Sequence, residues 1–214
     1  MTHSRRTSFI DHLVGSLDQG VRTVLGGAQA SRPNPSVEIR ATELGPSQAT
    51  AVAGLMRVNH AGEVAAQALY QGQALTAKEP CVRTALTDAA VEENDHLSWC
   101  RQRLEELGGR TSRLDPLWYI GSFLMGAAAG IAGDKWSLGF LAETERQVVE
   151  HLDEHLERIP SEDLRTRVIL EQMRDDEAGH ATTAVERGAA ELPGGIKFLM
   201  RCVSRVMTRT AFWV

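Results

Sequence analysis

The sequence predicts an all-α protein built as a four-helix bundle with one long crossover, and three observations favour this fold class. Alanine and leucine dominate the composition, whereas aromatic residues, which strands prefer, make up only 5% of the 214 residues. No segment of the sequence alternates apolar and polar residues as a half-buried strand does. Four long segments instead carry a helical pattern, and they group into two hairpins with a long connection between them.

Proline and glycine set the expected boundaries of the helices. Residues 8–27 are weakly helical in pattern, and residues 28–47, which contain three prolines, are expected to form a linker. The four bundle helices are expected at residues 47–77, 81–107, 135–158 and 161–190. Ser47 is the expected N-cap of the first of these helices. The fourth is expected to begin at Ser161, with two acidic residues (162–163) in its first turn.

The sequence also gives information about the cellular compartment and the domain organisation of the protein. The three cysteines form no Cys-x-x-Cys pair, which argues against a disulfide framework and a cysteine zinc site and indicates a reducing compartment. No cleavable signal sequence is visible, because Asp11 and Asp18 interrupt any apolar run near the N-terminus. We expect three parts: an N-terminal helix and linker over 1–47, the bundle over 48–193, and a basic amphipathic helix over 194–214.

The basic C-terminal segment combines an apolar stripe with a charged one. It carries four basic residues and no acidic one, although the whole chain has a net charge of −5. Its apolar stripe consists of Ile196, Leu199, Met200, Val203, Val206 and Met207. Its basic stripe consists of Lys197, Arg201, Arg205 and Arg209, and the segment ends with Phe212 and Trp213. Such a helix is typical of the surface of an anionic membrane; the alternative is a helix packed on the bundle.

Each expected hairpin contains one glutamate on its first helix and a Glu-x-x-His motif on its second. These six residues are Glu63, Glu93, His96, Glu145, Glu177 and His180. Within each hairpin the two glutamates lie at similar distances from the turn, so antiparallel packing would place all four carboxylates at one height in the bundle. A glutamate and a histidine three residues apart project from the same helical face, so each motif can offer both side chains to one metal ion.

Four ionised carboxylates inside a bundle need cations to neutralise them. Two divalent metal ions would supply the matching charge, and the two imidazoles would complete a ligand set that suits iron or manganese. The arrangement matches that of ferritin-like di-iron proteins. The alternative, that these residues belong to solvated helix faces, requires the coincidence of two motifs, each with an upstream glutamate at matched height.

Several other polar residues lie near the motifs. Asn59 and His60 lie about one helical turn before the first glutamate, and His151 lies six residues after the third. We expect them to support the metal ligands or to line a channel, although His60 also fits an exposed position. Tyr70 is expected in the core. The histidines expected to be solvated are His3, His12 and His155.

One uncharged stretch, residues 116–133, sits at the lower limit of length for a membrane span. A single crossing there would place the two halves of the candidate metal site on opposite sides of the membrane. We therefore expect a buried or interfacial helix that ends at a break near residues 133–134. Small residues would permit close packing or an opening in this helix: Gly121, Gly126, Ala127 and Gly130.

The motifs resemble those of the demethoxyubiquinone hydroxylases. Residues 57–63 are similar to the Asn-His-Ala-Gly-Glu signature of that family, and residues 92–97 and 176–180 are similar to its second and fourth ligand motifs. Glu145, with His151 six residues on, is similar to the third. The resemblance covers residues 48–214 and fills all six ligand positions, whereas the N-terminal segment is less characteristic.

The resemblance implies a di-iron monooxygenase that hydroxylates the ring of a polyprenylated demethoxy-ubiquinol, a late step in ubiquinone biosynthesis. It implies two iron ions per chain, O₂ as co-substrate, and NADH or the quinol itself as electron source. An apolar substrate would give the extra helices a membrane-facing role, with the protein peripheral on the cytoplasmic face of the cell membrane. The expected partners are membrane lipid, other proteins of ubiquinone biosynthesis and further copies of this chain, and not nucleic acid.

Two alternative functions would use the same six residues. A di-iron hydroxylase acting on tRNA would use the basic ends of the chain to contact phosphate, but the apolar segments argue against it. A ferritin-like iron-storage protein would need no substrate cavity and would lack residues 116–133.

Overall fold

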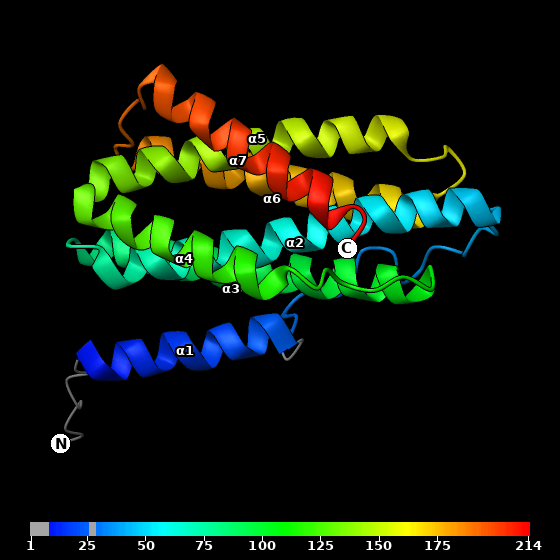
Figure 1. The fold of residues 1–214 in the computed structure, drawn as a ribbon, viewed down its shortest axis with the longest axis horizontal. Coiled ribbons are helices and arrows are strands. Elements are labelled where there is room, and N and C mark those ends of the chain that lie inside the picture. The colour runs from blue at the N-terminus through cyan, green and yellow to red at the C-terminus, as the bar shows by residue number, and fades with distance from the viewer. Residues whose placement is uncertain (1–8, 26–28) are drawn as a thin grey trace.

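The computed structural model describes residues 9–25 and 29–214, and all regular elements among these residues are α-helices (Figure 1). The helices are α1 (Phe9–Leu25), α2 (Pro46–Thr76), α3 (Pro80–Glu106), α4 (Asp115–Ala132), α5 (Asp134–Arg158), α6 (Leu164–Glu186) and α7 (Gly194–Ala211). The prediction of an all-α fold is confirmed. Helix α1 lies near the N-terminal end, and residues 29–45 form no helix or strand. Helix α4 is the crossover between the hairpin α2–α3 and the hairpin α5–α6.

Two apolar clusters fill the bundle, and each contains side chains from all four of its helices. One includes Met56, Trp99, Leu152 and Ile169; the other includes Leu69, Tyr70, Leu86, Leu138 and Ala184. On every bundle helix the candidate glutamate lies between the residues of the first cluster and those of the second. The polar layer is therefore enclosed by apolar packing at both ends, which keeps water from reaching it along the bundle axis. Tyr70 is buried, as predicted.

Two helix starts differ from the prediction. The N-cap of α2 is Gly45, not Ser47, and Pro46 occupies the first helical position, where its missing N–H costs nothing. Helix α6 begins at Leu164, not at Ser161, because Asp163 is its N-cap and its side chain accepts a hydrogen bond from the backbone N–H of Thr166. The prediction placed Asp163 inside the first turn, where it could not make this contact.

Helix α4 packs closely on α2, as the small residues of its sequence predict. A Cβ added at Gly126 would lie 2.1 Å from the backbone oxygen of Leu69, and one added at Gly130 would lie 1.9 Å from the side chain of Thr76. Gly121 faces away from any neighbour and does not contribute to this packing. The predicted break lies at Gly133, whose φ of 117° favours glycine. None of the described helices combines the length and apolar character needed to cross a membrane.

Helix α7 lies on the bundle with its charged side inward. Lys197 and Arg201 point toward the buried Glu143 of α5, at 3.4 Å and 3.7 Å. Most of its apolar residues are exposed, including Phe198 at 65% and Leu199 at 62%, whereas Met200 and Met207 are half-buried. Helix α4 also exposes apolar side chains, and it lies between α1 and α7 (Figure 1). Tyr119 of α4 packs on Gly20 of α1, so the three helices form one continuous side of the molecule.

Candidate metal centre

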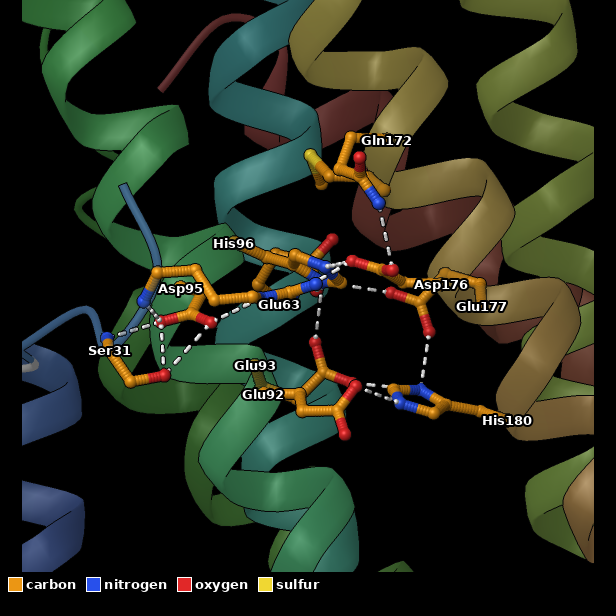
Figure 2. A network of polar contacts seen from close by, with 12 residues as sticks. Ser31, Glu63, Glu92, Glu93, Asp95, His96, Gln172, Asp176, Glu177 and His180 are labelled. Atoms are coloured by element: carbon orange, nitrogen blue, oxygen red, sulfur yellow. Dashed lines mark hydrogen bonds and ion pairs between the residues drawn. The ribbon is translucent and has the colours of Figure 1, made fainter. Parts of the chain in front are cut away.

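The six predicted residues meet in the polar layer. Their potential ligand atoms form two groups, and within each group these atoms lie within 4.8 Å of one another. The first group consists of Glu63, Glu93, His96 and Glu177, and the second of Glu93, Glu145, Glu177 and His180. Two carboxylates, those of Glu93 and Glu177, belong to both groups. Figure 2 shows side chains from the two Glu-x-x-His motifs facing one another across the bundle.

Both histidines turn their Nδ1 atoms toward the carboxylates. The Nδ1 of His96 lies 3.1 Å from Glu177 Oε1 and 3.2 Å from Glu93 Oε2. It also lies 3.6 Å from Glu63 Oε2. The Nδ1 of His180 lies 3.0 Å from Glu177 Oε2 and 3.7 Å from Glu93 Oε1. The helical spacing of each motif thus brings its own glutamate and histidine to the same point, as predicted.

The other ring nitrogen of each histidine contacts a carboxylate that the sequence analysis did not identify. His96 Nε2 lies 3.0 Å from Asp176 Oδ2, and His180 Nε2 lies 3.1 Å from Glu92 Oε2. Each of these carboxylates directly precedes the glutamate of the opposite motif, so the two helices support each other's histidines. Carboxylates in this position fix the tautomer and orientation of a metal-binding histidine. One feature of the sequence could have identified these two carboxylates: in both motifs an acidic residue immediately precedes the glutamate.

The linker also reaches the site, which the sequence analysis did not predict. Arg32 donates from a terminal nitrogen to Asp176 Oδ2 at 2.8 Å and from Nε to Asp95 Oδ2 at 2.6 Å. Gln172 donates to the other oxygen of Asp176 at 3.0 Å. No motif in the linker sequence distinguishes this arginine from a solvated one.

Burial and crowding shift the pKa values of the site. Burial, with the neighbouring carboxylate of Glu177, raises the pKa of Glu93 and of Glu145 well above the ordinary range. Burial opposes ionisation of Glu177 too, but hydrogen bonds from the two histidines outweigh it and lower its pKa to about 2. Burial disfavours the charged form of His180, yet its carboxylate partners prevail and raise its pKa to about 9.

Glu145 is the side chain whose environment most clearly calls for a cation. It is completely buried, yet neither of its carboxylate oxygens has a hydrogen-bond partner among the described residues. One oxygen of Glu93 has none either. Burying an ionised carboxylate without a partner costs several kcal/mol. A donor set of four carboxylates and two imidazole nitrogens fits two iron ions, which would satisfy these oxygens.

The three weaker candidates do not contact the cluster. Asn59 accepts a hydrogen bond from His155 at 2.8 Å, and the buried His60 lies 3.4 Å from Asp115. His151 packs against His155, with ring centroids 3.9 Å apart and the rings tilted by 57°, and it lines a cavity of about 590 Å³ beside α7. No hydrogen bond or ion pair in the described part of the chain joins Asn59, His60 or His151 to the six residues.

The prediction that His155 is solvated is wrong. Its side chain is buried because it faces Asn59 inside the bundle, and burial lowers its pKa to about 2. His3 lies outside the described residues, as does the side chain of His12.

A cavity of about 240 Å³ connects the surface to one side of the cluster. It lies between α3, α5 and α6, and its polar lining includes Asp88, Glu92, His180 and Arg187. The side chain of His180 is 12% exposed, whereas the five other candidate ligands are exposed by 4% or less. A molecule that enters this cavity would therefore reach the His180 side of the centre.

Comparisons with known proteins agree with this geometry. The family described as ubiquinone biosynthesis protein COQ7 matches residues 50–211. A 3-demethoxyubiquinol 3-hydroxylase of Nitrosococcus oceani is 56% identical over 211 residues, which cover 98% of this chain and 99% of that protein. Proteins of the same name from Nitrosomonas europaea and Acinetobacter baumannii are 55% and 54% identical, and cover 96% and 98% of this chain and 99% and 100% of their own lengths. The chain belongs to the ubiquinone biosynthesis protein COQ7 family.

Proposed function

We propose that this protein is a demethoxyubiquinol hydroxylase, which inserts one oxygen atom of O₂ into the ring of a polyprenylated quinol during ubiquinone biosynthesis. The observation that carries the proposal is the buried cluster of four glutamates and two histidines, in which Glu145 has no hydrogen-bond partner among the described residues. Near full-length relatives named 3-demethoxyubiquinol 3-hydroxylase support the choice of substrate.

The proposed ligands divide between two iron ions. Glu63 and His96 would serve one ion, Glu145 and His180 would serve the other, and the two shared carboxylates would contact both. Four carboxylates then balance the charge of two ferrous ions. When bound, the iron supplies the electrons that reduce O₂, and we propose NADH or the quinol as the source that restores them.

The side chains of the protein prepare the site for this chemistry. Asp176 and Glu92 lie where they would accept the Nε2 protons of His96 and His180, and each Nδ1 would then lose its proton when it bound a metal ion. The two apolar clusters keep water away from the layer between them, which protects a reactive centre from side reactions. Asn59, His60 and His151 do not contact the six residues; we propose that they act by shaping the packing around α2 and α5.

We also propose that the protein is peripheral on the cytoplasmic face of the cell membrane, where its apolar substrate resides. The orientation of α7 supports this, because a helix packed on the bundle for stability would bury its apolar residues, and α7 exposes most of them. Helices α1 and α4 extend the exposed apolar side. Other proteins of ubiquinone biosynthesis and further copies of this chain are the expected protein partners on that membrane.

The test is a single-turnover reaction. Purified protein is loaded with iron, reduced without oxygen, and mixed with O₂ and a short-chain demethoxyubiquinol, and the product mass is measured. We expect two irons per chain and a product heavier by one oxygen atom. Glu145→Ala should abolish product formation. Glu143→Ala is the matched control, because Glu143 is also a buried glutamate of α5 but pairs with α7.

A complementary test uses a strain that lacks the gene. It should accumulate the quinone that lacks one methoxy group, and the parent protein should restore ubiquinone whereas Glu145→Ala should not. Normal ubiquinone in the deletion strain, together with altered tRNA hydroxylation, would overturn the proposed substrate.

A further inference from the structure

The segment before α2 makes a dense set of contacts with the two motif helices. Asp95 of α3 is buried, and its Oδ1 accepts hydrogen bonds from the backbone N–H of Ser31 at 2.6 Å and of Arg32 at 3.2 Å (Figure 2). The Arg32 guanidinium spans from Asp95 to Asp176 of α6, and it lies 5.0 Å from the centre of the Trp99 ring. This arginine precedes residues 50–211, the part that the family match covers.

These contacts reach the centre through a single residue. Asp176 Oδ2 receives both Arg32 and His96 Nε2, and Asp176 Oδ1 receives Gln172. Three donors therefore fix this carboxylate in one orientation, and His96 must align with it. A planar guanidinium with several donors is well suited to hold two carboxylates at once.

The corresponding carboxylate on the other side of the centre lacks such a support. The side chain of Glu92 is 47% exposed, and within the described residues its hydrogen-bond partner is His180 alone. Each histidine thus has a carboxylate as its partner, but among the described residues further side chains hold the carboxylate of Asp176 and not that of Glu92.

We propose that Arg32 is a positioning residue of the metal centre: the linker, through Arg32, holds Asp176 so that His96 Nδ1 is directed at its iron ion. The inference rests on the proposed function, because it requires metal at the six-residue cluster. It predicts that loss of Arg32 weakens the metal position served by His96 and leaves the position served by His180 unchanged.

The experiment measures metal binding by the full chain after removal of iron. Co²⁺ is titrated into the parent protein, Arg32→Met and Arg32→Lys, and its visible absorption reports the two binding steps. We expect two steps in the parent, and in Arg32→Met a 10- to 100-fold weakening of one step, the range found when a supporting carboxylate of a metal-bound histidine is lost. Arg32→Lys, which keeps the charge without the planar fork, should fall between these two proteins.

Arg165→Met is the matched control. Arg165 also ties the linker to the bundle, through a hydrogen bond of 2.7 Å to the backbone oxygen of Ile39, but it does not contact Asp176. The Arg165→Met variant should bind Co²⁺ as the parent protein does. A double-mutant cycle with Asp176→Asn then asks whether Arg32 acts through Asp176, in which case the two losses are not additive.

The outcomes separate the two proposals. A parent protein that binds no metal at the cluster overturns the proposed function, and the role of Arg32 with it. A normal parent combined with unchanged binding by Arg32→Met overturns the role of Arg32 alone. Equal weakening of both steps with loss of helical circular dichroism also overturns it, because that result indicates general unfolding and not positioning.

Discussion

The two halves of the metal centre derive from one repeated motif but differ in how they are supported. The His96 half is closed: the ring is completely buried, and its carboxylate partner is itself held by two further side chains. The His180 half is open: the ring is 12% exposed, and its carboxylate partner, Glu92, is 47% exposed beside a cavity. A repeated ligand pattern therefore does not produce equivalent surroundings for the two histidines, because the residues outside the repeat differ between the halves.

The largest expected effect removes both halves at once. Glu177→Ala deletes a carboxylate that belongs to both groups and contacts both histidines, so neither metal ion should remain bound and hydroxylation should be lost. Helical circular dichroism should persist, since both apolar clusters remain intact. Iron analysis and product mass are the measurements; two retained irons would show that the cluster is not the binding site.

The second-largest effect is expected from variants that each alter one half of the centre. Asp176→Asn should weaken metal binding by about 10- to 100-fold, the usual consequence of losing such a partner. Glu92→Gln should cost less than Asp176→Asn, because the Glu92 side chain is half-exposed and water can replace it. Stepwise Co²⁺ titration of the two variants gives the comparison. Equal losses would mean that the closed and open halves are energetically the same.

The stability of the metal-free protein should depend on pH through both halves of the centre, because carboxylate partners raise the pKa of His96 as well as that of His180. The folded-state pKa of His180 is about 9, above its ordinary value near 6.5, so its proton stabilises the fold fully below about pH 6.5 and less as pH rises through about 9. Raised pKa values make Glu93 and Glu145 act in the same direction. The Tm of metal-free protein should fall between pH 6.5 and 9, whereas that of iron-loaded protein should change much less, because metal displaces these protons. A Tm that rises over this range without metal contradicts the prediction.

The smallest effect on the centre should come from α7, which contacts neither half. The double variant Leu199→Glu, Val206→Glu places charge on exposed apolar positions. Each change removes roughly 1.5–3 kcal/mol of apolar burial in lipid, so binding of the double variant to anionic vesicles should weaken about 100-fold or more. Iron content should equal that of the parent. Unchanged sedimentation with vesicles would mean that this face does not enter the membrane.

The sequence predicted the ligand cluster better than its surroundings. The six residues could be found because helical spacing and distance from a turn are local properties, and the structure brings all six together. The role of Arg32 could not be found, because its contacts with Asp95 and Asp176 join residues far apart in the chain. The predicted start of α6 is wrong because Ser161 and Asp163 can each act as an N-cap, and only the contact of Asp163 with Thr166 distinguishes them.

The sequence does not determine two further features, for a related reason. The prediction that His155 is solvated is wrong, and the sequence leaves the orientation of α7 undecided. A histidine on a helix gives no local sign of whether it faces Asn59 or solvent. The stripe pattern of α7 defines two faces but not which of them meets the bundle; that depends on Glu143, a buried acid of α5 that attracts Lys197.

Both apolar clusters gather side chains from all four bundle helices, on either side of the charged layer. These contacts specify the assembly of the four helices at each end of the bundle, so we expect the chain to fold before the proposed iron ions bind. Protein synthesis and iron supply would then be independent in time. A cell short of iron would hold a reserve of folded, inactive protein, and activity would return on the timescale of metal uptake and not of new translation.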